Sequence, residues 1–115
     1  MAISGLDIMP PLEKKYTRLL FYSRFLILHT LYYFDQDGIS YDDLKDTRKI
    51  GIPEGSLSPN LLWLKLYGYI REDTVEDERK TAYYITQQGK NAFLELHKWL
   101  SIMIDLVDRN GNKKG

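Results

Sequence analysis

The hydrophobic pattern between residues 40 and 86 constrains the fold of this chain more than any other feature. It begins with the period of a helix, is interrupted by glycine and proline from 51 to 55, and resumes the helical period up to Gly68. From Tyr69 it changes to residues that favour strands, on both sides of an acidic segment from 72 to 78. The sequence therefore predicts a helix, a tight turn, a second helix and a β-hairpin, in that order.

The two helices of this helix-turn-helix are marked differently. Ser40 begins a capping box for a short helix that reaches about Lys49. The start of the second helix stays open between two positions. Ser58 followed by Pro59 forms a good N-cap and first turn, whereas a start near Glu54 would place the proline inside the helix and kink it.

Long apolar patterns flank this region on both sides. Pro10 and Pro11 can open a helix that ends before Gly38, and Thr86 can cap the last helix. Because the sequence has no internal repeat and no linker, we expect a single domain over residues 1–115. We expect a mainly α fold with a small β-hairpin, made of an N-terminal helix at about 11–34, the helix-turn-helix at about 40–68, the hairpin at about 69–86 and a C-terminal helix at about 87–108.

Composition excludes several classes of function. The chain has no cysteine, and its two histidines lie apart in apolar helical segments, so we expect no metal site and no cofactor. It also has no glycine-rich phosphate loop and no nucleophile beside a plausible base, so we expect no enzymatic activity. Residues 1–11 lack the basic and apolar regions of an export signal, which predicts a cytoplasmic protein.

Two stretches carry a resemblance to a known superfamily: Gly55-Ser56-Leu57-Ser58 with Leu61, Leu64 and Gly68-Tyr69-Ile70, and Arg79 with Tyr84-Ile85-Thr86 and Gly89. The first resembles the second helix of the helix-turn-helix, called the recognition helix, in MarR- and PadR-like regulators. The second resembles the far side of their β-hairpin, called the wing. The resemblance implies a winged helix-turn-helix with long N- and C-terminal helices, and a homodimeric transcription regulator that binds double-stranded DNA at specific sequences.

The resemblance also implies where DNA would be contacted. Short polar side chains at the start of the recognition helix can reach phosphates or base edges, and cations on the helix-turn-helix and beside the wing tip can reach phosphates. We therefore expect the DNA contacts at Lys45, Arg48, Lys49, Ser56, Ser58, Asn60, Trp63, Lys65, Arg71, Arg79 and Lys80.

Charge and hydrophobicity point to a second class of function. The chain is neutral, with 16 basic and 16 acidic residues, and residues 40–81 carry seven basic residues against nine acidic ones. A DNA-binding module is normally basic. The face of the recognition helix opposite its core positions carries Leu62 and Leu66 with Trp63 beside them, and contiguous apolar surface more often marks a protein contact. The alternative is therefore a protein-interaction module that docks on a partner protein through this face.

The last helix predicts self-association. Its apolar residues recur at alternating spacings of three and four, and one domain core cannot cover both this stripe and the apolar first helix. Two copies that pack these helices together would set two wings apart for successive half-sites on DNA. The expected dimer contacts are Phe25, Phe93, Leu96, Trp99, Leu100, Met103 and Val107.

Overall fold

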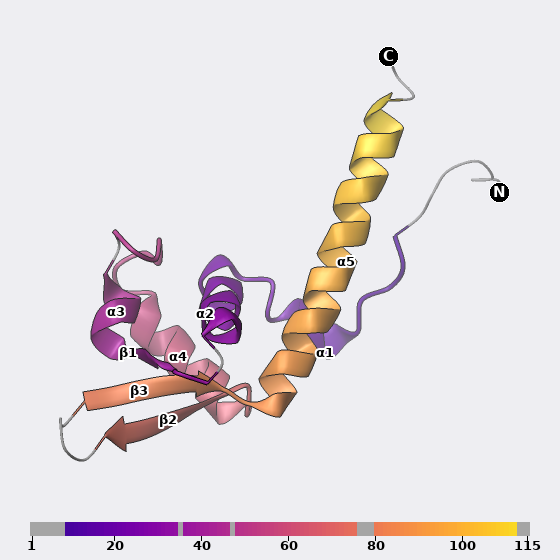
Figure 1. The fold of residues 1–115 in the computed structure, drawn as a ribbon. Coiled ribbons are helices and arrows are strands. Elements are labelled where there is room, and N and C mark those ends of the chain that lie inside the picture. Colours follow the sequence, from indigo (N-terminus) through magenta and orange to yellow (C-terminus); the bar gives the residue numbers. More distant parts are fainter. Residues whose placement is uncertain (1–8, 35, 47, 76–79, 113–115) are drawn as a thin grey trace.

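The computed structural model describes residues 9–34, 36–46, 48–75 and 80–112, and it has the predicted mainly α fold with a small antiparallel sheet (Figure 1). In chain order the elements are α1 (Lys14–Thr17), α2 (Tyr22–Tyr33), β1 (Ile39–Ser40), α3 (Tyr41–Lys45), α4 (Leu57–Leu66), β2 (Ile70–Val75), β3 (Lys80–Ile85) and α5 (Gln87–Asn112). Among these described helices, none is long and apolar enough to cross a membrane.

The sheet contains one strand more than the predicted hairpin. Its order is β1-β3-β2, with both pairs antiparallel. In the wing formed by β2 and β3, Ile70 lies opposite Ile85, and on the other edge of β3 Ile39 lies opposite Tyr83. The sequence did not predict β1 because two residues are too few to show an alternating pattern.

The single N-terminal helix predicted at about 11–34 was wrong, because the structure divides it into α1 and α2. The chain turns over residues 18–21, and Leu19 in this turn is fully buried. The carbonyl of Arg18, which no longer has a helical partner, accepts a hydrogen bond from Nη1 of Arg24 at 2.8 Å. No glycine or proline marks this break, so tertiary contacts override the local helical pattern.

The helix-turn-helix also differs from the prediction at its boundaries. The hydroxyl of Ser40 caps α3 by accepting from the backbone N–H of Asp43 at 3.1 Å, as expected, but α3 ends at Lys45 rather than at about residue 49. The recognition helix α4 begins at Leu57, between the two starts that the sequence left open. Pro59 therefore lies in the first turn, where a missing N–H costs no helical hydrogen bond and causes no kink.

The core lies between α2, α4, the sheet and the first half of α5, and its most buried members are Leu19, Ile27, Leu28, Leu31, Leu44, Leu64 and Leu96. Leu57, Leu61 and Leu64 form the buried face of α4. Figure 1 shows that the second half of α5 extends well beyond the sheet and the other helices. The helix ends at Asn112 rather than at about residue 108.

One junction joins α4, the wing and α5. The hydroxyl of Thr86 donates to the carbonyl of Gly68 at 2.6 Å and accepts from the backbone N–H of Gly89 at 3.0 Å, so Thr86 caps α5 as the sequence predicted. Gly89 lies so close to the backbone that a Cβ there would stand 2.1 Å from the carbonyl oxygen of Tyr69 and 2.8 Å from Cγ1 of Ile85. Only glycine fits at this position.

We predict that Gly89→Ala lowers the free energy of unfolding by about 3 kcal/mol, because the added methyl group forces the Tyr69 backbone away from α5. Urea unfolding followed by circular dichroism measures this change. Gly111→Ala is the matched control, since nothing lies within 4 Å of its Cβ position and alanine favours a helix by up to about 1 kcal/mol. Equal stabilities of the two variants would contradict the prediction.

Candidate nucleic-acid interface

The outer face of α4 is apolar and open to solvent. Leu62 and Leu66 are 53% and 72% exposed, and Pro59, one turn earlier on the same face, is also exposed. In this chain nothing in the described part covers these side chains, as the helical wheel predicted. We call Pro59, Leu62 and Leu66 the apolar face.

One flank of the apolar face is tied to α3 and the wing. The hydroxyl groups of Ser58 and Tyr41 lie 2.8 Å apart in a hydrogen bond, and Nζ of Lys65 donates to Oε2 of Glu72 at 2.8 Å. The Glu72 carboxylate raises the pKa of Lys65 through this hydrogen bond and its charge. A cavity of about 180 Å³ lies between these residues and Leu62. Two predicted DNA contacts, Ser58 and Lys65, therefore lie on the wing side of α4.

The other flank is tied to α2 through Arg24. Its Nε donates to Oδ1 of Asn60 at 3.0 Å and its Nη1 donates to the carbonyl of Arg18 at 2.8 Å. Its guanidinium carbon lies 3.8 Å from the ring centre of Trp63 and 4.6 Å from that of Phe21, so the cation contacts two aromatic rings. No carboxylate pairs with this cation in the described part of the chain.

Burial of Arg24 carries an electrostatic cost. Its partial burial lowers the pKa of its guanidinium and the nearby positive charge of Arg18 lowers it further, whereas Tyr67 acts in the opposite direction. The compensation comes from hydrogen bonds to neutral oxygens and from the two aromatic faces. The Asn60 side chain that accepts from Arg24 also donates through Nδ2 to the carbonyl of Ser56 at 2.7 Å. It therefore connects Arg24 to the start of α4. Asn60 and Trp63 therefore hold α4 in place, whereas the sequence predicted both as DNA contacts.

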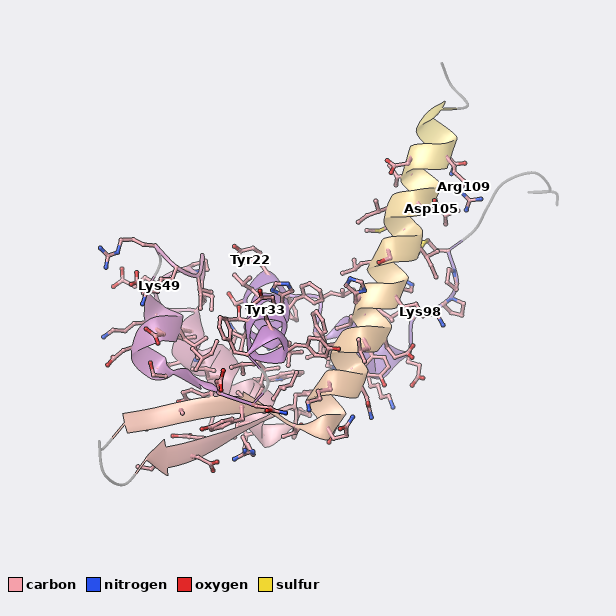
Figure 2. All side chains as sticks on the ribbon, viewed as in Figure 1. Tyr22, Tyr33, Lys49, Lys98, Asp105 and Arg109 are labelled. Atoms are coloured by element: carbon pink, nitrogen blue, oxygen red, sulfur yellow. The ribbon has the colours of Figure 1, made fainter. Side chains whose placement is uncertain are left out.

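Every predicted cation whose side chain the structure describes is paired with a carboxylate. The pairs besides Lys65 with Glu72 are Lys45 with Asp42 at 3.8 Å, Arg48 with Asp46 at 3.2 Å, Lys49 with Asp43 at 3.0 Å, and Arg71 with Asp73. Figure 2 places Lys49 on the side of the molecule that is far from α5. These exposed pairs add little stability, but they reduce the positive charge that a phosphate would meet.

Of the remaining predicted DNA contacts, Ser56, Arg79 and Lys80, the structure describes only the side chain of Ser56. Ser56 precedes α4 without a cap bond from its side chain, and its carbonyl is taken by Asn60. Arg79 lies outside the described residues, and Lys80 is described only as the first residue of β3. Sequence reasoning missed Arg24 as a positioning residue, because its partners Trp63 and Asn60 are far away in the sequence.

The expected dimer contacts on α5 divide into two groups. Phe93 and Leu96 are buried in the core of the single chain, where Phe93 stacks on Phe25 with ring centres 5.5 Å apart, so this part of the prediction needs correction. Nε1 of Trp99 donates to the carbonyl of Pro10 at 2.9 Å. The second group lies further along the helix, where Leu100 and Met103 are half-buried and Val107 is exposed.

Residues 23–104 match the family of winged helix DNA-binding domains, and no curated protein sequence matches the chain. Among solved structures, the fold is similar to that of a MarR-like transcription regulator from Bacillus cereus, with a TM-score of 0.65 and 16% sequence identity. The similarity covers 84% of this chain and 65% of that protein, so the chain spans less than two thirds of its length. At this identity the likeness establishes the fold.

We predict that Arg24→Ala lowers the free energy of unfolding by about 2 kcal/mol, because it removes two hydrogen bonds and the contacts with two rings. Arg24→Lys should recover only part of this loss, since an ammonium group lacks the planar fork of donors. Chemical denaturation measures both. Arg48→Ala is the control, because an exposed ion pair contributes less than about 1 kcal/mol. An equal loss of stability in this control would contradict the prediction that the contacts of Arg24 stabilise the fold more than an exposed ion pair does.

Proposed function

Because the chain belongs to the family of winged helix DNA-binding domains, we propose that it is a transcription regulator that binds double-stranded DNA as a homodimer. The family match carries this proposal, since residues 23–104 contain the whole helix-turn-helix and the wing. In this reading α4 enters the major groove and the wing lies beside the phosphate backbone. We propose no enzymatic activity, no cofactor and a cytoplasmic location.

The rigid support of α4 favours this role. Lys65 and Ser58 tie one flank to the wing and α3, and Arg24 ties the other flank to α2. A helix held on both sides presents its exposed face in one orientation, which recognition of a groove requires. Thymine methyl groups are the part of the major groove that an apolar face such as Leu62 and Leu66 can contact.

The dimer is proposed from the second half of α5. Ile104 and Val107 are 59% and 64% exposed, and Leu100 and Met103 lie along the same face of the helix. Figure 2 shows Asp105 and Arg109 on the polar side of this half of α5, with Lys98 on the same side just before it. Pairing of two α5 helices would remove the apolar face from water and place two copies of α4 at a defined separation.

A second candidate is a protein-interaction module that docks through the apolar face. Two observations favour it. The described cations of the helix-turn-helix and β2 are paired with carboxylates, and Leu62 and Leu66 expose apolar surface that suits a protein partner. Trp63 contributes less than the sequence predicted, because its ring lies against Arg24 and Tyr67.

We predict that the chain has twice its mass of 13.5 kDa in light scattering at micromolar concentration. Ile104→Glu with Val107→Glu should give the monomeric mass, since burial of unpaired carboxylates in the dimer costs about 3 kcal/mol or more. Lys98→Glu is the control, because it makes the same change in net charge on the polar side of α5. A monomeric mass of the folded wild-type chain would refute the dimer.

We predict that the wild-type chain binds labelled duplex DNA at low salt and loses affinity as salt rises, which fluorescence anisotropy measures. Leu62→Lys with Leu66→Lys should strengthen this binding and steepen its salt dependence, because the new charges meet phosphates. Its stability should change by less than about 0.5 kcal/mol, as both side chains are exposed. Tyr33→Lys with Leu94→Lys, which adds the same charge at exposed apolar sites on α2 and α5, is the control.

The same pair of variants separates the two candidates. No binding of the wild-type chain to duplex DNA at low salt would reject the regulator. A protein complex that Leu62→Lys with Leu66→Lys abolishes, and that the control variant keeps, would then support the interaction module. Unfolding of Leu62→Lys with Leu66→Lys would mean that the apolar face is covered within the protein, which contradicts both candidates.

A further inference from the structure

The N-terminal segment carries an excess of positive charge that the helix-turn-helix and the wing lack. Residues 10–24 contain four basic residues and one acidic residue, whereas residues 40–81 are net acidic. Lys15 is paired with Glu13 at 3.4 Å. In the described part of the chain, no carboxylate lies within 4.0 Å of the ammonium of Lys14 or the guanidinium of Arg18. Both side chains are exposed.

The break between α1 and α2 brings these two cations to the recognition helix. A cavity of about 390 Å³ lies between α1 and the end of α4, lined by Lys14, Lys15, Arg18, Trp63, Tyr67 and Tyr69. A continuous helix from about 11 to 34 would have carried Lys14 and Arg18 away from α4 along the axis of α2. The hydrogen bond from Arg24 to the carbonyl of Arg18 fixes the turn that prevents this.

The position of this cavity indicates that a DNA phosphate backbone would lie against it. It lies on the flank of α4 opposite the wing, since Trp63 and Asn60 face α2 whereas Ser58 and Lys65 face α3 and β2. When a helix enters the major groove, a phosphate backbone runs along each of its flanks. The backbone on the wing side meets Lys65, which Glu72 already neutralises. The backbone on the other side meets Lys14 and Arg18, for which the described residues supply no carboxylate partner.

We propose that Lys14 of α1 and Arg18, which directly follows α1, are the main phosphate contacts of this chain, in place of the paired cations on α3 and in the turn after it. This inference rests on the proposed function, because it names how the same interface holds its DNA. The positive charges of Arg18 and Arg24 lie close together, which an approaching phosphate stabilises. Lys14 and Arg18 are four residues apart, so their side chains can reach the same backbone.

The test compares two double variants that remove equal charge. Lys14→Gln with Arg18→Gln should bind labelled random duplex DNA on the order of tenfold more weakly per charge at about 50 mM salt. The slope of log affinity against log salt should become less steep by about two, which is about one for each lost contact. Lys45→Gln with Arg48→Gln should bind like the wild-type chain, within about twofold, because Asp42 and Asp46 already neutralise these cations.

Two further variants guard against loss of folding. Lys14→Arg with Arg18→Lys keeps both charges and should bind like the wild-type chain. Lys14→Gln alone, which leaves the turn at Arg18 intact, should change the salt slope by about one. Wild-type slope and affinity in the Lys14→Gln, Arg18→Gln variant, or an equal loss in both double variants, would overturn this inference while the regulator stands. Failure of the wild-type chain to bind duplex DNA would overturn both.

Discussion

The guanidinium group of Arg24 is the contact on which the candidate interface depends. It joins three segments that are separate in sequence: the turn at Arg18, α2 itself, and α4 through Asn60 and Trp63. A partly buried cation without a carboxylate is costly, so its environment must supply well-placed acceptors and aromatic faces. The planar group meets this requirement in one orientation only. On this flank α4 is therefore held by directed hydrogen bonds and ring contacts, whereas the Lys65–Glu72 ion pair holds the other flank.

This arrangement separates two properties that DNA-binding modules usually combine on one surface. The apolar face of α4 is exposed, and the described cations of the helix-turn-helix and β2 are paired with neighbouring carboxylates. In the described part of the chain, Lys14 of α1 and the adjacent Arg18 have no carboxylate partner, and they lie across Trp63 from the apolar face. In such an interface, α4 supplies the surface that fits the groove, and Lys14 and Arg18 supply the positive charge. The net acidic composition of residues 40–81 is then compatible with a DNA-binding role.

The sequence predicted the features whose signals are local, and it missed those that depend on distant contacts. The cap at Ser40, the hairpin from Tyr69 and the cap at Thr86 each follow from residues within a few positions of one another. The break at 18–21 contains no helix-breaking residue, because it is made by Leu19 entering the core and by Arg24. The buried positions of Phe93 and Leu96 were equally hidden, since an apolar stripe on a helix does not tell which part faces its own core.

The junction at Thr86 also bears on how the chain assembles. Its hydrogen bond to Gly68 spans 18 residues, whereas the bond from Arg24 to Asn60 spans 36 and the bond from Trp99 to Pro10 spans 89. The entropy lost on closing a loop grows with the length of chain enclosed. The end of α4, the wing and the start of α5 thus form the unit that is least costly to order first. The contact of Arg24 with Asn60 encloses a longer loop than this junction, so the orientation of α4 is completed at a greater entropic cost than the junction itself.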